Sequence, residues 1–240
     1  MVNRSFIKLA DVDLAQPETW QGKQVLTFDI DWASDDVLTY TIDLLAEASL
    51  PATFFVTHDT PVLERIRQNP QWELGIHPNF NPLFSGEAGS VSEILAKIKM
   101  VVPEAVSLRS HSLTTSGRWL EFYRQYGIKF VSNVYMPGQD GIRPYAHING
   151  LIECPEFFAD DGYLYMIDQA KRAGIEPAVL CHPDFVGLRV YDFHPIHIAL
   201  NSESLSRYEE TRSFHQDWKQ LHQARFSGFG IENLFRKLLT

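Results

Sequence analysis

Two aspartates, Asp29 and Asp31, stand one residue apart directly after the run VLTF at residues 25–28, which is typical of a buried parallel strand. Burying one unpaired carboxylate is costly and burying two like charges together costs more, so the pair must face solvent or share a counter-ion. Capping of the following helix would explain Asp31 but would leave Asp29 without a role. The spacing therefore indicates metal-assisted proton chemistry, with Asp31 as a metal ligand and Asp29, on the same side of the extended chain, as a general base.

Histidines and an arginine end other apolar runs along the chain. A catalytic zinc-type site needs about three protein ligands, an open position for water and a base. His77 is suited as a ligand, and His182 as the acid that protonates a leaving amine or alcohol. Arg109 would fix the direction of a carboxylate such as Asp29. The other strand-end histidines, for which an ordinary hydrogen-bonded role is an equal alternative, are His58 and His111.

Short apolar strands that alternate with helices must position these side chains. Such alternation predicts a parallel sheet with helices outside it, an open doubly wound sheet or a closed barrel, whose active site forms at the carboxyl ends of the strands. No glycine-rich phosphate loop follows the first strand, which argues against a nicotinamide enzyme. The chain from Phe193 onward is expected to cover the barrel, with a helix over 203–222. The expected strands are residues 25–32, 52–59, 72–79, 105–112, 129–134, 150–157 and 177–184, and the expected helices are 34–50, 61–68, 90–102, 116–126 and 160–173.

Length, charge and cysteine content restrict the class of protein. The 240 residues suit a single α/β domain over 1–240, and the formal net charge of −9 argues against a nucleic-acid partner. No run of about 18 apolar residues occurs, so no membrane span is expected. The first residues, interrupted by Lys8 and Asp11, are too polar for a secretory signal, which predicts a cytoplasmic location. Cys154 and Cys181 lie in apolar runs and are expected to be buried thiols.

The order of the motifs resembles the polysaccharide deacetylases, carbohydrate esterase family 4 with the NodB-homology fold. The segments that carry the resemblance are TFDID, ATFFV, ELGIHPNFNP, LRSHS and LCHPD, between residues 25 and 184. It implies an α/β fold, a distorted (β/α)7 barrel of parallel strands, and removal of acetyl groups from N-acetylated sugars with a divalent metal, commonly zinc. It also implies that Asp29 is the catalytic base and Asp31 a metal ligand. By the same resemblance, Arg109 orients the base and His182 is the catalytic acid.

The sequence departs from the pattern of that family at three places. Asn81 stands four residues after His77, where the family has a second histidine, so the expected ligand set is Asp31, His77 and Asn81. An amide oxygen is a weaker ligand than imidazole, which leaves open that His111 or His58 replaces Asn81, or that metal binding is weak. After Arg109, the family's proline pair and aromatic residue are absent. The aspartate that polarises the acid has no clear match, and the residues that could take its place are Glu153, Glu156, Asp160 and Asp161.

These observations predict a metal-dependent hydrolase that removes an acyl group, in particular acetyl, from an N-acylated sugar, in surface-polysaccharide biosynthesis. The lack of an export signal favours a small sugar or a lipid-linked or nucleotide-linked sugar intermediate as the substrate. The alternative is a non-catalytic carbohydrate-binding relative with a degenerate metal site. The sequence leaves the sugar, the metal and the oligomeric state open.

Overall fold

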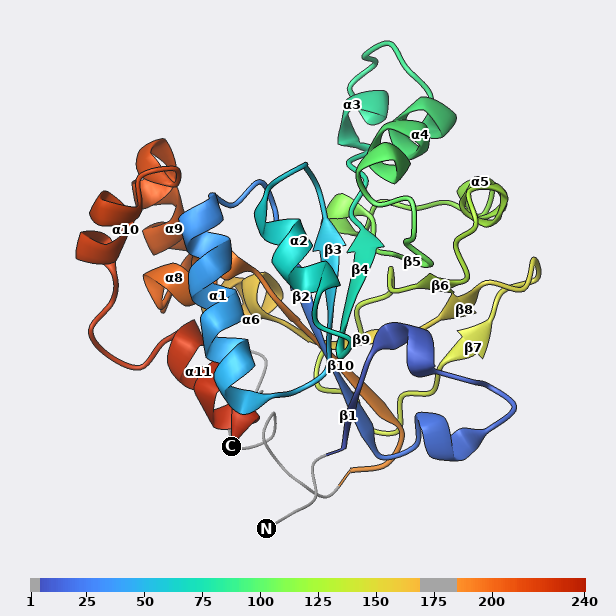
Figure 1. Cartoon of the computed structure of the whole chain (residues 1–240), viewed down its shortest axis with the longest axis horizontal. Coiled ribbons are helices and arrows are strands. Elements are labelled where there is room, and N and C mark those ends of the chain that lie inside the picture. The colour runs from blue at the N-terminus through green and yellow to red at the C-terminus, as the bar shows by residue number, and fades with distance from the viewer. Residues whose placement is uncertain (1–4, 169–184) are drawn as a thin grey trace.

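A curled, mostly parallel sheet with helices around it forms the core of the computed structural model, which describes residues 5–168 and 185–240 (Figure 1). The strand order is β7-β8-β6-β5-β4-β3-β2-β10-β9, and β1 pairs with β2. β7 runs antiparallel to β8, and the other described strand pairs are parallel. The strands are β1 (Phe6–Ile7), β2 (Lys23–Asp29), β3 (Ala52–Val56), β4 (Trp72–Ile76), β5 (Ser107–Leu108), β6 (Phe130–Val131), β7 (Tyr145–Ala146), β8 (Ile152–Glu153), β9 (Glu156–Ala159) and β10 (Leu188–Phe193).

The sheet curls because the segment that follows β6 returns to β9. Tyr135 and Glu156 form an isolated parallel bridge, Met136 N donates to Glu156 O at 2.8 Å, and Gly138 N donates to Phe157 O at 2.9 Å. These bonds join the edge strand β9 to the segment that follows β6, near the other end of the strand order, so the sheet curls into a half-barrel. The predicted α/β class with a distorted barrel of parallel strands is thus confirmed.

Helices cover the outside of the sheet, and two of them begin where the sequence predicts. The Ser34 side chain caps α1 by accepting from Val37 N, and the Ser90 side chain caps α4 by accepting from Glu93 N. Within the described residues, no helix is long and apolar enough to cross a bilayer. The helices are α1 (Asp35–Ala48), α2 (Val62–Arg67), α3 (Asn81–Phe84), α4 (Val91–Val101), α5 (Trp119–Gln125), α6 (Asp160–Asp168), α8 (Pro195–Leu200), α9 (Leu205–Thr211), α10 (Trp218–Ala224) and α11 (Ile231–Leu239).

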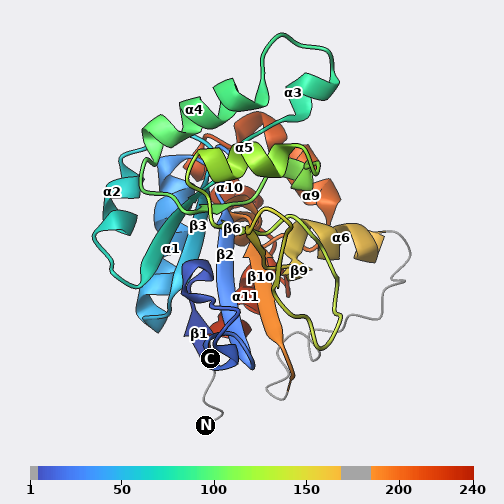
Figure 2. The same cartoon turned by 90° about the vertical axis from the view of Figure 1, so that its right-hand side faces the viewer.

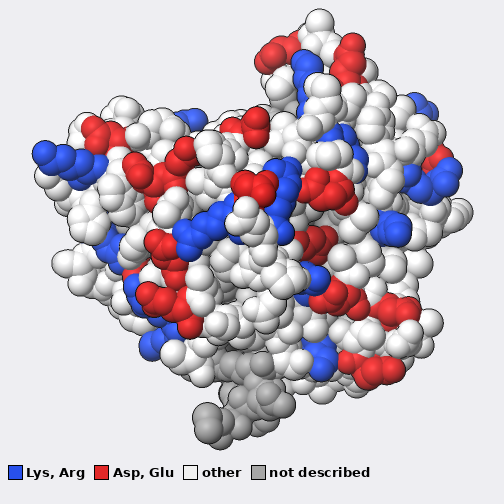
Figure 3. Space-filling view, viewed as in Figure 1, with Lys and Arg blue, Asp and Glu red and all other residues white. Residues whose placement is uncertain are grey.

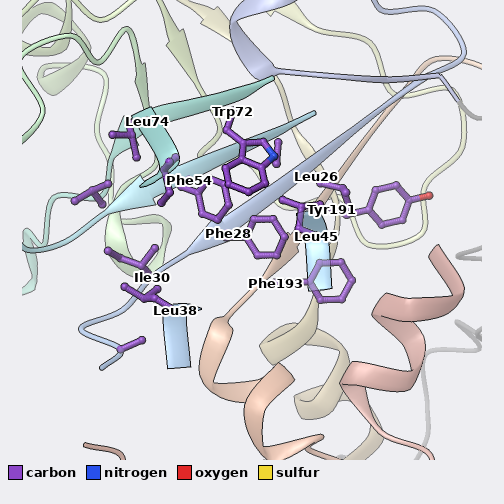
Figure 4. Close-up of a cluster of buried hydrophobic side chains, with 14 of the residues drawn as sticks. Leu26, Phe28, Ile30, Leu38, Leu45, Phe54, Trp72, Leu74, Tyr191 and Phe193 are labelled. Carbon is purple, nitrogen blue, oxygen red and sulfur yellow. The ribbon is translucent and has the colours of Figure 1, made fainter. Parts of the chain in front are cut away.

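Aromatic packing fixes β2 between β3 and β10. Phe28 of β2 stacks on Phe54 of β3 with ring centroids 4.9 Å apart, and meets Phe235 of α11 edge to face at 5.7 Å. The ring centroids of Phe28 and Phe193 of β10 are 6.4 Å apart (Figure 4). Aromatic pairs of this kind add about 0.5–1.5 kcal/mol each beyond the area that they bury. The residue that follows Phe28, Asp29, is therefore held at a well-defined position.

The strand next to β2 is β10, which the sequence analysis did not predict. Its six residues, Leu188–Phe193, are all buried, and they pair with Lys23–Phe28 in parallel register, as Figure 2 shows from the side. The expectation that the chain only covers the barrel from Phe193 onward is therefore wrong at its start, because Phe193 ends β10, a strand of the sheet that pairs with both β2 and β9. The run LRVYDFH has the same character as VLTFDID, branched and aromatic residues followed by an acid, and this signal was missed. The expected strand over 177–184 lies outside the described residues.

Candidate active site

The carboxyl ends of β2, β4, β5 and β10 meet at one rim, where polar side chains surround a pocket of about 220 Å³. Asp29 ends β2, and His77 follows β4. His111 lies in the turn after β5, and His194 directly follows β10. Figures 1 and 2 show that helices α3–α5 and α9–α10 lie around this end of the sheet. The topology thus gathers chemically active residues that are up to 165 positions apart in the chain, such as Asp29 and His194.

Three ligand atoms at this rim are spaced as in a metal site. Asp31 Oδ1 lies 3.3 Å from His77 Nε2 and 3.1 Å from His111 Nδ1, and the two ring nitrogens are 3.3 Å apart. Ligands of a tetrahedral zinc ion, at bond lengths of about 2.0–2.1 Å, are separated by about 3.3 Å. Two imidazole nitrogens facing each other need a shared cation or a proton between them. The donor set Asp31, His77 and His111 therefore fits a divalent metal, as the clustering of these three groups also indicates.

The electrostatics of Asp31 agree with a ligand role. Burial alone would raise the pKa of its carboxyl group. Hydrogen bonds from His111 and His77 and the charge of His194 outweigh burial and hold the Asp31 pKa well below its ordinary value. The group is thus an anion in the folded protein, as a metal ligand must be.

Strained backbone positions two of these candidate ligands. Asp31 and Trp32 have φ angles of 35° and 55°, and Ser112 and Leu113, beside His111, have φ angles of 56° and 51°. All four are non-glycine residues in the left-handed region, which costs of order 1–3 kcal/mol each. Strain of this kind collects at functional sites because the surrounding structure enforces a particular side-chain direction. Here the two strained turns direct Asp31 and His111 toward each other.

Asp29 lies between His77 and a buried arginine. Its Oδ2 atom is 3.4 Å from His77 Nε2, and its Oδ1 atom is 3.0 Å from Arg109 Nη1. The side chain is buried but lines the pocket. The structure therefore brings together Asp29 and Arg109 in the arrangement that the sequence analysis expects for a base and the residue that orients it.

Three carboxylates surround the single charge of Arg109, which is fully buried. Besides Asp29, Arg109 Nη1 lies 2.6 Å from Asp192 Oδ1, and Nε lies 2.6 Å from Glu156 Oε1. Burial would lower the Arg109 pKa, but Asp192, Asp29 and Glu156 raise it above its usual value. Burial also raises the pKa of Asp192 to about 8 and that of Glu156 well above its usual range. Asp29 therefore shares the positive charge of Arg109 with the carboxyl groups of Asp192 and Glu156.

His194 is a functional candidate that the sequence analysis missed. Its Nδ1 atom lies 2.7 Å from Asp160 Oδ1, its backbone N–H donates to Asp160 Oδ2 at 2.8 Å, and its Nε2 atom lies 3.6 Å from Asp31 Oδ2. Burial would lower the His194 pKa, but the Asp160 carboxylate raises it well above its ordinary value. An imidazolium whose second nitrogen faces the pocket is suited to donate a proton. Its sequence signal was the histidine that directly follows the overlooked strand β10.

The four acidic residues considered for polarising an acid occupy different places. Asp160 binds His194, and Asp161 is exposed and lines the same pocket. Glu156 pairs with Arg109, whereas Glu153 Oε2 lies 3.0 Å from His147 Nε2. Asp160 is thus the one of the four that contacts a pocket histidine through a short bond.

The remaining residues of the sequence analysis lie elsewhere. Asn81 Oδ1 accepts from Thr114 Oγ1 at 2.8 Å, and Asn81 Nδ2 donates to Ser112 Oγ at 3.2 Å, so its amide supports the turn that carries His111. Asn81 is not one of the described residues that line the pocket. His58 Nδ1 lies 2.9 Å from Thr57 Oγ1, outside the ligand trio. His182 lies outside the described residues, so its role as the acid stays a prediction.

Comparisons with known proteins identify the family of this chain. The sequence model of a family described as "WbmS-like: Polysaccharide deacetylase" matches residues 26–212. Among curated proteins, no significant match is found. WbmS of Bordetella bronchiseptica, assigned as a polysaccharide deacetylase involved in O-antigen biosynthesis, has a crystal structure that is similar with a TM-score of 0.89 and 40% identity, over 98% of this chain and 97% of that one.

Two other solved structures resemble this one more remotely. A protein of Mycobacterium smegmatis assigned as a polysaccharide deacetylase has a TM-score of 0.47 and 18% identity, over 72% of this chain and 77% of that one. The 4-alpha-glucanotransferase of Thermococcus litoralis has a TM-score of 0.44 and 13% identity, over 85% and 38% of the respective chains. The family match spans well over half of the sequence, and the similarity to WbmS extends over nearly all of it. The chain therefore belongs to the WbmS-like polysaccharide deacetylase family.

Proposed function

We propose that this protein is a metal-dependent hydrolase that cleaves the amide of an N-acetylated sugar to give acetate and a free amine. The observation that carries the proposal is the spacing of Asp31 Oδ1, His77 Nε2 and His111 Nδ1, which are 3.1–3.3 Å from one another. The similar WbmS is assigned to O-antigen biosynthesis, and we extend a role in surface-polysaccharide assembly to this chain.

Each residue at the rim has a role in this proposal. Asp31, His77 and His111 would hold the metal, and zinc suits a set of two nitrogens and one oxygen. Bound there, zinc would supply a Lewis acid for the acyl oxygen and a water of lowered pKa. Asp29, directed by Arg109, accepts the proton of the attacking water, since its Oδ2 atom lies beside the ligand trio.

His194 completes the proton transfers as the general acid. Its imidazolium, polarised by Asp160, donates a proton to the nitrogen of the leaving amine. The base and the acid follow neighbouring strands, β2 and β10, and both line the pocket. A binding-only relative would have no use for these two buried charge pairs, Asp29 with Arg109 and His194 with Asp160, and their presence favours the hydrolase over the carbohydrate-binding alternative.

Acetate release that depends on zinc is the expected result for the purified protein. Assayed with N-acetylated hexosamines, free, nucleotide-linked and oligomeric, the zinc-loaded protein should release acetate, and a chelator should abolish the release until zinc is restored. Metal content is measured in parallel by mass spectrometry. Acetate release that survives removal of the metal would contradict the metal role. Stoichiometric zinc without acetate release from any of these substrates would favour the binding relative.

Replacement of His111, and not of Asn81, is expected to destroy metal binding. Loss of an outer-shell partner already weakens metal affinity by about 10–100-fold, so loss of the ligand in His111→Ala should weaken zinc binding by at least about 100-fold. Asn81→Ala removes only the support of the turn through Ser112 and Thr114, so its effect on zinc affinity should not exceed the about 10–100-fold of an outer-shell partner. Competitive zinc titration measures both. A larger loss of zinc affinity in Asn81→Ala than in His111→Ala would identify Asn81 as the third ligand.

A further inference from the structure

A fixed and exposed indole ring lies beside the catalytic pocket. Trp32 is 43% exposed, and its ring meets that of His111 edge to face with centroids 5.2 Å apart. Its backbone has a left-handed φ of 55° and is held on both sides: Trp32 N donates to Thr57 Oγ1 at 3.0 Å, and Gln216 Nε2 donates to Trp32 O at 2.9 Å. Backbone strain of this kind persists only where the surrounding structure enforces it and collects at functional sites, so the strained position of this exposed ring at the rim favours a ligand-binding role.

A groove of about 280 Å³ begins at Trp32 and runs along α4. It shares His77 with the catalytic pocket, and Thr57 and Pro78 also line it. A hollow of about 510 Å³ continues it, because both are lined by Asn79, Ile94 and Lys97. The catalytic pocket alone has about 220 Å³, less than the roughly 300–1,000 Å³ of most ligand sites. The pocket can therefore hold the acyl group and its immediate surroundings, while a larger substrate extends into the groove.

Lys97 brings a positive charge to this groove. Its side chain is exposed, and in residues 5–168 and 185–240 no carboxylate lies within ion-pair distance of its ammonium group. Glu93, one turn earlier on α4, is bound to Ser90 Oγ at 3.1 Å. On the face drawn in Figure 3, acidic and basic side chains are interspersed, and the chain carries a net charge of −9. An anion therefore finds little attraction from the surface as a whole and depends on a cation placed at the site.

Building on the hydrolase function proposed above, we propose that the groove recognises an N-acylated sugar that carries or is linked to an anionic group. The sugar ring packs on Trp32, because the electron-rich face of an indole attracts the slightly positive C–H groups of a pyranose. The anionic group, a phosphate or a carboxylate, binds the Lys97 ammonium, for which both are natural partners. Trp32 and Lys97 are thus specificity-determining residues outside the reacting centre.

Calorimetric binding of three probes to the zinc-loaded protein tests this inference. The probes are N-acetylglucosamine, N-acetylglucosamine 1-phosphate, and the disaccharide of glucuronic acid and N-acetylglucosamine. At least one anionic probe should bind about tenfold more tightly than the neutral sugar, and Lys97→Ala should remove that advantage. Lys129→Ala, at an exposed lysine next to β6, is the matched control and should retain it. Trp32→Ala should weaken the binding of all three probes, while Trp32→Phe, which keeps an aromatic ring, should retain part of the affinity of the parent.

The outcomes separate this inference from the proposed function. The anionic probe that gains affinity identifies phosphate or carboxylate as the recognised group. Equal binding of the three probes, no binding of any of them, or equal effects of Lys97→Ala and Lys129→Ala would overturn the role of Lys97. If the binding pattern appears without acetate release, the groove stands and the hydrolase proposal fails. If acetate is released equally from neutral and anionic sugars by both lysine variants, the hydrolase stands and the groove proposal fails.

Discussion

Asp29→Asn is expected to lower kcat by about 10²–10⁴-fold, the usual contribution of a general base. The amide keeps the shape of the side chain and can still accept from Arg109 Nη1, which lies 3.0 Å from Asp29 Oδ1, but it cannot take a proton from water. Because the ligand trio does not include Asp29, zinc affinity should fall by no more than the about 10–100-fold of an outer-shell partner. Steady-state acetate release and a zinc titration measure the two quantities.

A matched variant controls for the loss of a negative charge at the rim. Asp59 is an exposed aspartate that follows β3 on the same side of the sheet, and Asp59→Asn should leave kcat nearly unchanged. A kcat of Asp29→Asn that stays within tenfold of the parent would show that another group takes the proton. A loss of zinc in the same variant would instead mean that Asp29 takes part in metal binding.

His194→Ala is expected to lower kcat by a comparable factor, about 10²–10⁴-fold, and to remove the alkaline limb of the pH–rate profile. A general acid must be protonated, and Asp160 raises the His194 pKa above that of ordinary imidazole. In the parent, activity should therefore persist to a pH above the usual imidazole range and fall only when His194 loses its proton. Asp160→Asn leaves burial to lower the pKa, so the alkaline limb should move to lower pH. Profiles of kcat from pH 5 to 10 or so measure both effects.

His182→Ala provides the comparison for this prediction. The family resemblance assigns the acid to His182, and the structure places His194 at the pocket next to Asp160. Loss of the alkaline limb in His182→Ala, with an unchanged limb in His194→Ala, would return the assignment to His182. Loss of the alkaline limb in His194→Ala, together with a kcat of His182→Ala close to that of the parent, would establish His194 as the general acid.

The sequence alone determined the parts of this protein that depend on near neighbours. The apolar run before Asp29 predicts a buried strand, and β2 ends at that residue. Ser34 and Ser90 predict helix starts, and both side chains cap α1 and α4. The order of motifs predicts the polysaccharide deacetylase family, which the comparisons confirm. These signals are local because the periodicity of strands and helices and the capping of helices depend on residues only a few positions apart.

Only the tertiary structure decided which distant side chains meet. Asn81 has the spacing of a ligand but bonds to Ser112 and Thr114, while His111 reaches Asp31 and His77 from a turn with left-handed φ angles. Residue spacing does not encode such a turn, since Ser112 and Leu113 have no intrinsic preference for that conformation. Likewise β10 pairs with β2 across more than 160 residues, and this pairing brings His194 to Asp31 and Asp192 to Arg109. Long-range strand order is set by packing of the whole core, so the proposed acid His194 and the contact of Asp192 with Arg109 became visible only in the folded chain.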